Sequence, residues 1–189
     1  MTSKPAQSLL DRNRAVLVVV DLQERLLPAI HDRERVVGNA KLLLRLARTV
    51  DVPVVLTTQY KKGLGDLVPE VTALAPEAPA LDKVSFGCFG DPAFLERLGT
   101  LGGRDQLVVS GVETHICVAQ TVLGALDKGY SVHVASDAVG SRTPDNRAVG
   151  LSRMEAAGAV LSSTEMAVYE LLGRSDSDAF KKMLPYLKG

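Results

Sequence analysis

The sequence lacks tryptophan and has only four phenylalanines and four tyrosines among its 189 residues. Proteins that stack the bases of single-stranded nucleic acid need aromatic side chains, so this composition disfavours that class. An excess of one charge is also missing, since 22 lysines and arginines balance 22 aspartates and glutamates. Proteins that track nucleic-acid phosphates usually carry a basic excess. We therefore expect no nucleic-acid partner.

Long apolar runs and paired cysteines are equally scarce. The longest strongly apolar run, residues 15–20, falls far short of the roughly 20 residues that span a bilayer. The first fourteen residues contain no apolar signal-peptide core. Two cysteines, Cys88 and Cys117, make a poor disulfide framework, and no C-x-x-C spacing indicates zinc. The sequence thus predicts no membrane partner and a cytoplasmic location.

Short apolar segments alternate with longer amphipathic ones along the chain. Apolar, often β-branched runs predict strands over 15–20, 54–58, 80–84, 106–111, 130–136 and 159–162. Helical spacing and capping signals predict helices over 33–50, 66–74, 91–98, 114–128, 143–158 and 162–173. This order predicts an α/β, three-layer Rossmann-like fold, whose six-stranded parallel sheet has helices on both faces. Length and uniform composition predict a single domain over residues 1–189.

Three chemically active side chains follow the ends of predicted strands. Asp21 comes directly after the first strand, Lys83 closes the third, and Cys117 lies one turn into the helix after the fourth. Ligand sites of parallel sheets lie beyond the carboxyl ends of the strands, so we expect these groups to meet at one edge. Each alone is more often a cap, a solvated charge or a packed core residue. Together, an acid, a cation and a thiol indicate a nucleophilic site.

The position of Cys117 favours a reactive thiol. If Thr114 is the N-cap, the backbone N–H of Cys117 is among those without an intrahelical partner, and it can hold a developing oxyanion. The helix dipole and Lys83 are expected to lower the pKa of the thiol. Asp21 is expected to take the thiol proton and later to deliver it to a leaving amine.

The same residues carry a resemblance to a known family. The segment VDLQ at 20–23, then Lys83, then GVETHICV at 111–118 resemble the isochorismatase-like cysteine hydrolase superfamily. Residues 57–65, TTQYKKGLG, resemble its isochorismatase domain-containing branch. The likeness runs from about residue 14 to about residue 172. It implies an α/β fold with a six-stranded parallel sheet and a hydrolase activity.

The resemblance also implies roles for individual residues. In this family an aspartate, a lysine and a cysteine typically form a catalytic triad, which falls here on Asp21, Lys83 and Cys117. A non-proline cis peptide bond commonly precedes the nucleophile helix, which places it between Val112 and Glu113. Such a bond turns the Glu113 N–H, together with that of Cys117, toward the oxyanion.

Departures from the family pattern limit which of the family's reactions we expect. Nicotinamidases of the superfamily carry an aspartate and histidine metal cluster after the second strand, whereas residues 59–82 contain no histidine. His133 lies within a predicted strand, where core packing is the commoner role. We therefore expect no metal and no cofactor. Some true isochorismatases, which cleave a vinyl ether, dispense with the cysteine, so Cys117 favours a thioester intermediate on a small amide or acyl compound.

Two other functions stay open at this point. One is a vinyl-ether hydrolase that uses Asp21 as its acid, and the other is a degenerate member that only binds or scaffolds. An intact triad disfavours the second of these. Release of ammonia or of pyruvate from a panel of substrates distinguishes the amide reaction from the ether reaction.

Further expectations concern the pocket and the assembly. Gln23, Tyr60, Phe86 and Phe89 are candidates for lining the substrate pocket, although aromatic residues near strand ends more often pack. An apolar stripe over residues 178–187 must pack on its own chain or on a neighbour. Together with the resemblance, this stripe predicts a homo-oligomer, at least a dimer, that acts on a small-molecule substrate.

Overall fold

Parallel pairing of all six strands gives the molecule its architecture. The computed structural model describes residues 9–188. The sheet has the order β3-β2-β1-β4-β5-β6, and every neighbouring pair is parallel. The strands are β1 (Ala15–Val20), β2 (Val54–Gln59), β3 (Ala80–Lys83), β4 (Gln106–Val112), β5 (Ser131–Gly140) and β6 (Val160–Ser162). The predicted α/β fold with a six-stranded parallel sheet is confirmed.

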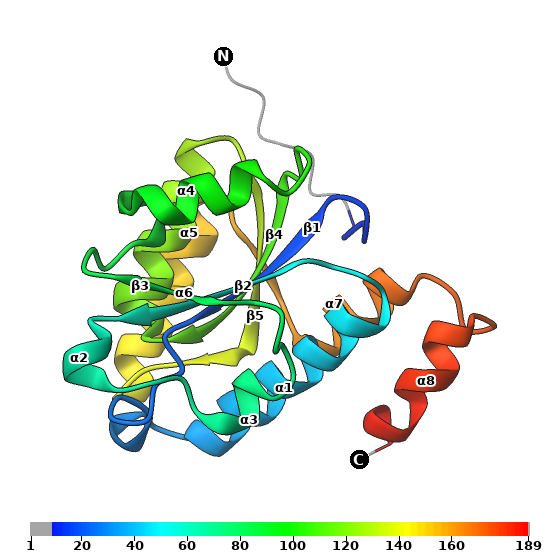
Figure 1. Ribbon diagram of the computed structural model, residues 1–189, viewed down its shortest axis with the longest axis horizontal. Helices are drawn as coiled ribbons and strands as arrows, with labels where there is room; N and C mark the ends of the chain where they lie inside the picture. Colours follow the sequence, from blue (N-terminus) through cyan, green and yellow to red (C-terminus); the bar gives the residue numbers. More distant parts are fainter. Residues whose placement is uncertain (1–8, 189) are drawn as a thin grey trace.

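Helices cover both faces of the sheet (Figure 1). The longer ones are α1 (Arg33–Thr49), α4 (Pro92–Gly99), α5 (Ala119–Asp127), α6 (Pro144–Ala157), α7 (Thr164–Leu172) and α8 (Asp178–Leu187). The short ones are η1 (Leu27–Ala29), α2 (Lys61–Leu64), α3 (Pro69–Thr72), η2 (Cys88–Gly90) and the π-helical turn η3 (Thr114–Val118). α1, α7 and α8 share one buried cluster with the sheet, whereas α4, α5 and α6 share the other.

The central strand β1 is buried along its whole length. Its side chains alternate between the two clusters, with Leu17 and Val19 in one and Val18 and Val20 in the other. A strand covered on both faces is therefore a continuous apolar run, as the sequence shows. The strand order reverses between β1 and β4, so the ends of these two strands form the crevice where such sheets bind ligands.

Three elements differ from prediction by more than their end residues. β5 continues to Gly140 through a register irregularity with β4, whereas the predicted strand ends at residue 136. The helix predicted from Thr114 begins as the π turn η3, and its N-cap is Glu113 without a side-chain capping bond. The helix predicted over 66–74 is helical only at Pro69–Thr72, because a turn follows it directly.

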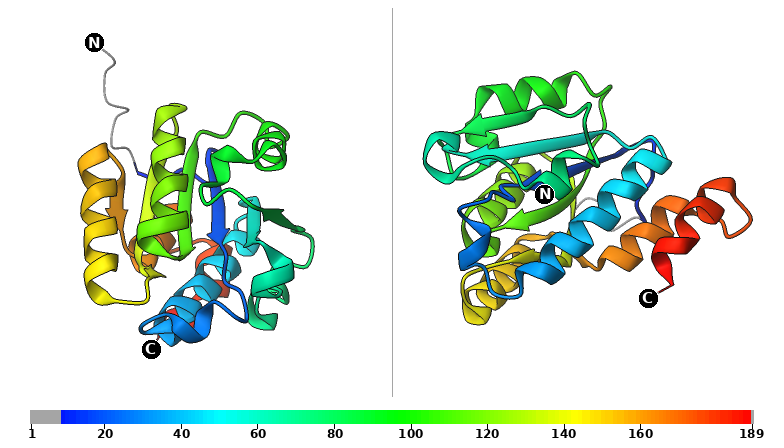
Figure 2. Two further views of the ribbon diagram at one scale, coloured as in Figure 1. Left: turned by 90° about the vertical axis from the view of Figure 1, so that its left-hand side faces the viewer. Right: turned by 60° about the horizontal axis from the view of Figure 1, so that its bottom comes forward.

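The tail helix α8 packs its apolar stripe on its own chain. Met183 is fully buried, and its sulfur accepts a hydrogen bond from Thr49 Oγ1 of α1 at 3.5 Å. The ring of Tyr186 lies 4.5 Å from the guanidinium of Arg45. Figure 2 shows α8 beside α1 and α7. The stripe therefore carries no argument for an oligomer, since the body of the same molecule covers it.

His133 of β5 is a core residue, as predicted, but one without a hydrogen-bond partner. Its neighbours Val132 and Val134 face the cluster with α5, so strand alternation directs His133 to the opposite face. The residue is 3% exposed, and neither ring nitrogen bonds to any group in the described part of the chain. Burial lowers the pKa of this imidazole, because its charged form is the harder one to dehydrate, although Glu170 opposes the shift.

We expect His133→Leu to make the fold less sensitive to acid. Since the pKa of His133 lies below its unfolded value of about 6.5, the unfolded chain takes up the proton first. The stability that His133 contributes is therefore complete above about pH 6.5 and is lost as the pH falls below it. Urea midpoints at pH 7.5 and pH 5 measure the loss, with exposed His31→Gln as the control. Equal losses in His133→Leu and wild type would contradict the argument.

Candidate active site

The three side chains at the strand ends meet in one place. The Lys83 Nζ lies 2.7 Å from Asp21 Oδ2, and the two side chains are 1% and 0% exposed. The thiol of Cys117 lies close enough to the Asp21 carboxylate for the two to interact. Cys117 itself is buried, with 6% exposure. The topology thus brings together an acid, a cation and a thiol that are far apart in the sequence.

Strand pairing holds Asp21 in position. Its φ of 53° turns the chain out of β1, a conformation that few residues other than glycine adopt and that is common at functional sites. Its N–H donates to the Thr57 carbonyl at 3.2 Å, and its Oδ1 accepts from Thr57 Oγ1 at 2.7 Å. Because β1 and β2 pair Val20 with Thr57, the sheet itself places this hydroxyl beside the carboxylate.

Three acceptors surround the Lys83 ammonium. They are Asp21 Oδ2, Gln59 Oε1 at 2.8 Å and the Phe86 carbonyl at 3.2 Å. An ammonium has three N–H donors, so the chain itself uses all of them. Lys83 therefore fixes Asp21 and has no donor left for a ligand. Pairing of Gln59 with Lys83 in the sheet brings the amide into this position.

The sequence analysis missed Thr57 and Gln59 as members of the site. Both lie at the carboxyl end of β2, which runs between the strands that carry Asp21 and Lys83. Their position at that strand end was the available signal. Their residue types gave none, because threonine and glutamine are ordinary at the end of a strand.

The structure separates the four candidates for the pocket. The Gln23 amide is fully buried and bonds to the backbone of Gln59 and Gly65, which is a structural role. The ring of Phe89 packs against Phe94 and Tyr130, with ring centroids 5.2 Å and 5.6 Å away. Tyr60 and Phe86, by contrast, are 53% and 55% exposed. Both contact Lys83 through their backbone: the Tyr60 N–H donates to the Lys83 carbonyl, and the Phe86 carbonyl accepts from Lys83 Nζ.

The turn that carries Cys117 is held tightly to its surroundings. The peptide bond between Val112 and Glu113 is cis, as the resemblance implies. Thr121 Oγ1 donates to the Cys117 carbonyl at 2.7 Å and accepts from the Cys88 N–H at 3.0 Å. The hydroxyl thereby ties the segment after β3 to the turn that carries Cys117. At Gly111, with φ 117°, a Cβ would lie 2.0 Å from the Val20 carbonyl oxygen, so only glycine lets β4 approach β1 here.

The Cys117 thiol holds its proton in the resting protein. Burial raises its pKa to about 12, the Asp21 carboxylate adds to the rise, and Lys83 opposes it only in part. The predicted lowering of this pKa is therefore wrong for the resting state. Dehydration of the thiolate and repulsion from Asp21 outweigh the single cation. Burial likewise raises the pKa of Cys88 to about 11.

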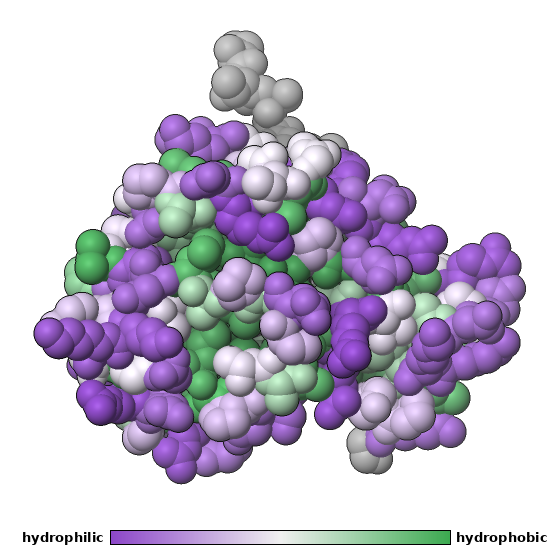
Figure 3. Space-filling view, in the orientation of Figure 1, coloured by the Kyte–Doolittle hydropathy of each residue, from purple (hydrophilic) through white to green (hydrophobic). Residues whose placement is uncertain are grey.

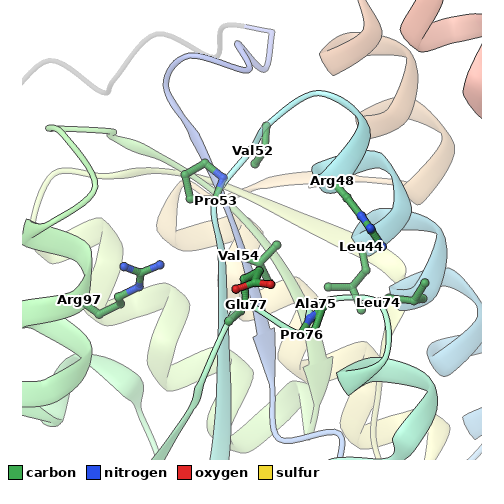
Figure 4. A pocket seen from close by; sticks show the side chains of 11 residues that line it. Leu44, Arg48, Val52, Pro53, Val54, Leu74, Ala75, Pro76, Glu77 and Arg97 are labelled. Carbon is green, nitrogen blue, oxygen red and sulfur yellow. The ribbon is translucent and has the colours of Figure 1, made fainter.

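A cavity lies at the other end of the strands. It has a volume of about 300 Å³ near the start of β2 (Figure 4), with lining residues Leu44, Arg48, Val52, Pro53, Val54, Leu74, Ala75, Pro76, Glu77, Ala78 and Arg97. Figure 3 shows apolar surface between charged rims on the face that β2 crosses. None of the three site side chains lines this cavity. Its place at the amino end of β2 separates it from the candidate site.

Two structural features are absent from residues 9–188. No group of three or more histidine, cysteine, aspartate or glutamate side chains in this range is placed to hold a metal ion. In the same range, no helix is both long enough and apolar enough to cross a membrane.

We expect Asp21→Asn to lower the pKa of the Cys117 thiol. The substitution removes the carboxylate that opposes the thiolate and leaves the charge of Lys83 unbalanced. Alkylation of Cys117 by iodoacetamide then becomes fast at a lower pH than in the wild type, whose thiol pKa is about 12.

Mass spectrometry of the alkylated peptides separates Cys117 from Cys88. Asp82→Asn, which removes an exposed carboxylate from β3, is the matched control and should alkylate as the wild type does. A pH profile of Asp21→Asn that coincides with that of Asp82→Asn would refute the electrostatic account of the thiol.

Comparison with known proteins gives one consistent family. The family model "Isochorismatase domain" matches residues 15–166. Isochorismatase domain-containing protein 2 of Bos taurus is 35% identical over 187 residues, which cover 98% of this chain and 89% of the relative. The resemblance to the isochorismatase-like superfamily and to this branch is confirmed.

Three solved structures share the whole fold. The MAR1 ribonuclease structure from Caenorhabditis elegans has a TM-score of 0.90 at 32% identity, over 96% of this chain and 93% of that one. YcaC from Pseudomonas aeruginosa, solved with hexane-2,5-diol and covalent acrylamide, has 0.89 at 32%, over 96% and 93%. YcaC from Escherichia coli, described as an octameric hydrolase of unknown specificity, has 0.88 at 31%, over 97% and 95%.

Proposed function

Because this chain belongs to the isochorismatase family, we propose that it is a cysteine hydrolase that cleaves a small amide or acyl compound through a thioester on Cys117. The observation that carries the proposal is the closeness of the Cys117 thiol to the Asp21 carboxylate, which raises the pKa of that thiol. Thr57 holds one oxygen of Asp21, and Lys83 holds the other. These two hydrogen bonds fix the orientation of the carboxylate, which suits it to take the proton of the thiol.

The proton moves together with the attack. Since the resting thiol is protonated, Asp21 takes its proton as the bond forms between Cys117 Sγ and the acyl carbon. Asp21 then gives the proton to the leaving amine as the carbon–nitrogen bond breaks. Water attacks the thioester in the second half, gives one proton to Asp21 and releases the acid, and the proton returns to Sγ. Every proton is accounted for without an external base.

Backbone donors stabilise the developing negative charge. In this proposal, the N–H groups of Glu113 and Cys117 bind the oxyanion of the tetrahedral intermediate. Lys83 does not contact the substrate, since its donors are used by Asp21, Gln59 and Phe86. Its role is to position Asp21 and to offset part of its charge.

Two of the similar structures support this chemistry. The Pseudomonas aeruginosa protein is described with covalent acrylamide, which reports a nucleophilic group in a protein of the same fold. The Escherichia coli protein is described as a hydrolase. The Caenorhabditis elegans protein is named a ribonuclease. We propose a small molecule and not RNA for this chain, because its charges balance and the reacting groups are buried.

The proposal includes a metal-independent reaction and a cytoplasmic location. The proton path described here runs through Asp21 and Cys117 alone and requires no Lewis acid. Both cysteines are free thiols in the structure, which suits a reducing compartment.

We expect Cys117→Ala to abolish turnover of any amide or acyl substrate while the fold persists. The change removes the nucleophile but only one small buried sulfur. Cys88→Ala is the matched control, because it removes the other buried thiol and should keep turnover within about threefold. Ammonia release from an amide panel and far-ultraviolet circular dichroism measure the two effects. Near-native turnover by Cys117→Ala would exclude the thioester and favour an Asp21-driven ether hydrolysis.

We also expect a homo-oligomer in solution. The support comes from the octamer described for the Escherichia coli protein, which is 31% identical to this chain. Exposed apolar side chains of Tyr60, Val84 and Phe86 are suited to an interface between copies. Light scattering at micromolar concentration should give a mass well above the 20.2 kDa of one chain. A monomeric mass would remove this prediction.

A further inference from the structure

The cavity at the amino end of β2 lies where the sheet has no edge strand. β3 begins opposite Leu56, so no residue of β3 pairs with Val54, the first residue of β2. The carbonyls of Pro53 and Thr57 accept hydrogen bonds on the β1 side, and backbone groups alternate along a strand, so those of Val54 point to the other side. Pro79, which precedes β3, has no N–H to donate. The start of β2 therefore leaves an open sheet edge at this cavity, which Val54 lines.

The walls of the cavity are apolar side chains at the margin of the core. Leu44 and Val52 belong to the buried cluster that α1 shares with the sheet, and they are 0% and 4% exposed. Val54, Leu74 and Ala78 are partly buried and pack against that cluster. Small-molecule sites are likewise lined mostly by apolar groups, and the volume of about 300 Å³ is at the lower end of their range. The cavity thus has room for the apolar body of a small molecule.

Three charged side chains lie at the rim of this cavity (Figure 4). Arg48 comes from α1 and Arg97 from α4, which are helices on opposite faces of the sheet, and Glu77 comes from the connection between α3 and β3. None of the three takes part in an ion pair among the described residues. The side chain of Arg97 donates one long hydrogen bond, from Nη1 to Thr100 Oγ1 at 3.4 Å. Two cations and one carboxylate leave the rim with a net positive charge.

Arginines without an ion pair beside apolar walls favour one kind of ligand. A guanidinium presents five N–H donors in a plane and no acceptor, so a carboxylate matches it in two parallel hydrogen bonds. A ligand with one negative charge neutralises the net charge of the rim, whereas a cationic ligand adds to it. The walls and the rim together therefore select a molecule that has an apolar body and an anionic head group.

We propose that this cavity binds a small monocarboxylate with an apolar body, such as an aliphatic acid of medium chain length. The chain of the ligand lies against Leu44, Val54 and Leu74, and its carboxylate is held by Arg48 and Arg97. The three side chains of the candidate active site do not line this cavity, so the binding site is separate from the site proposed for hydrolysis. The inference therefore does not depend on the proposed function.

Calorimetric titration with octanoate tests the proposal. Cys117→Ala serves as the background protein, so that no acyl transfer at the candidate active site contributes heat. We expect octanoate to bind, octanol to bind more weakly and octylammonium to bind most weakly, because the three differ only in the head group. Hexanoate should bind about fifteenfold more weakly than octanoate, since each buried methylene strengthens binding about fourfold.

Charge variants of the rim should change the affinity for octanoate in opposite directions. Arg97→Gln should weaken binding by up to about fivefold, the upper end for an ion pair near the surface. Glu77→Gln should strengthen binding, because the substitution removes the carboxylate that repels the ligand. Arg153→Gln and Glu155→Gln, which remove exposed charges from α6, are the matched controls and should bind octanoate as the background protein does.

A cavity-filling variant locates the bound ligand. Ala78→Trp places an indole among the walls and should abolish octanoate binding, whereas Ala156→Trp, at an exposed position of α6, should not. Unchanged binding by Ala78→Trp, or no saturable binding of octanoate up to millimolar concentration, would overturn the proposal. So would equal affinities for octanoate and octanol, or equal affinities of Arg97→Gln and Arg153→Gln for octanoate. If Ala78→Trp fails to fold, the opposite effects of Arg97→Gln and Glu77→Gln still decide.

Discussion

The buried ion pair of Asp21 and Lys83 is the interaction on which the site and one edge of the sheet depend. The two charges come from the ends of β1 and β3, with β2 between them. Dehydrating both is costly, and the cost is offset only when further hydrogen bonds complete each group. Thr57 completes the carboxylate, and Gln59 and Phe86 complete the ammonium. Loss of one charge alone would destabilise such a pair by about 3–5 kcal/mol.

The same pair explains why the thiol beside it is neutral. The carboxylate and the ammonium together carry no net charge, so a thiolate would add an uncompensated negative charge to a dry site. Passing the proton from Cys117 to Asp21 avoids this, because the number of charges stays constant. In the proposed reaction, the geometry that stabilises the resting state thus favours a coupled proton transfer over a preformed thiolate.

Sequence reasoning reached the fold and the meeting of the three side chains, because both follow from strand order. A parallel α/β chain must bring the ends of its strands to one edge, which placed Asp21, Lys83 and Cys117 together. It did not reach the contributions of Thr57 and Gln59, since these depend on which strand lies between two others. That order is a property of the sheet and has no local sequence signal.

The sequence also could not predict features that depend on how deeply a residue is buried or on what packs against it. The sign of the pKa shift of Cys117 is decided by how deeply the sulfur is buried, and neither spacing nor residue type measures depth. The stripe of α8 likewise identifies a buried face but not what covers it, and here Met183 packs on α1. The extension of β5 beyond the predicted end at residue 136 follows from pairing with β4, in which Gly140 lies opposite Val112.

The buried, protonated state of Cys117 has a consequence for the lifetime of the protein. Peroxide and other oxidants attack thiolates. A thiol with a pKa of about 12 is almost entirely protonated at neutral pH and therefore reacts with them very slowly. In the proposed mechanism, Asp21 takes the proton of Cys117 only as the sulfur attacks a bound substrate. Burial therefore protects the sulfur from oxidation in the absence of substrate, so that the nucleophile of the proposed reaction stays reduced.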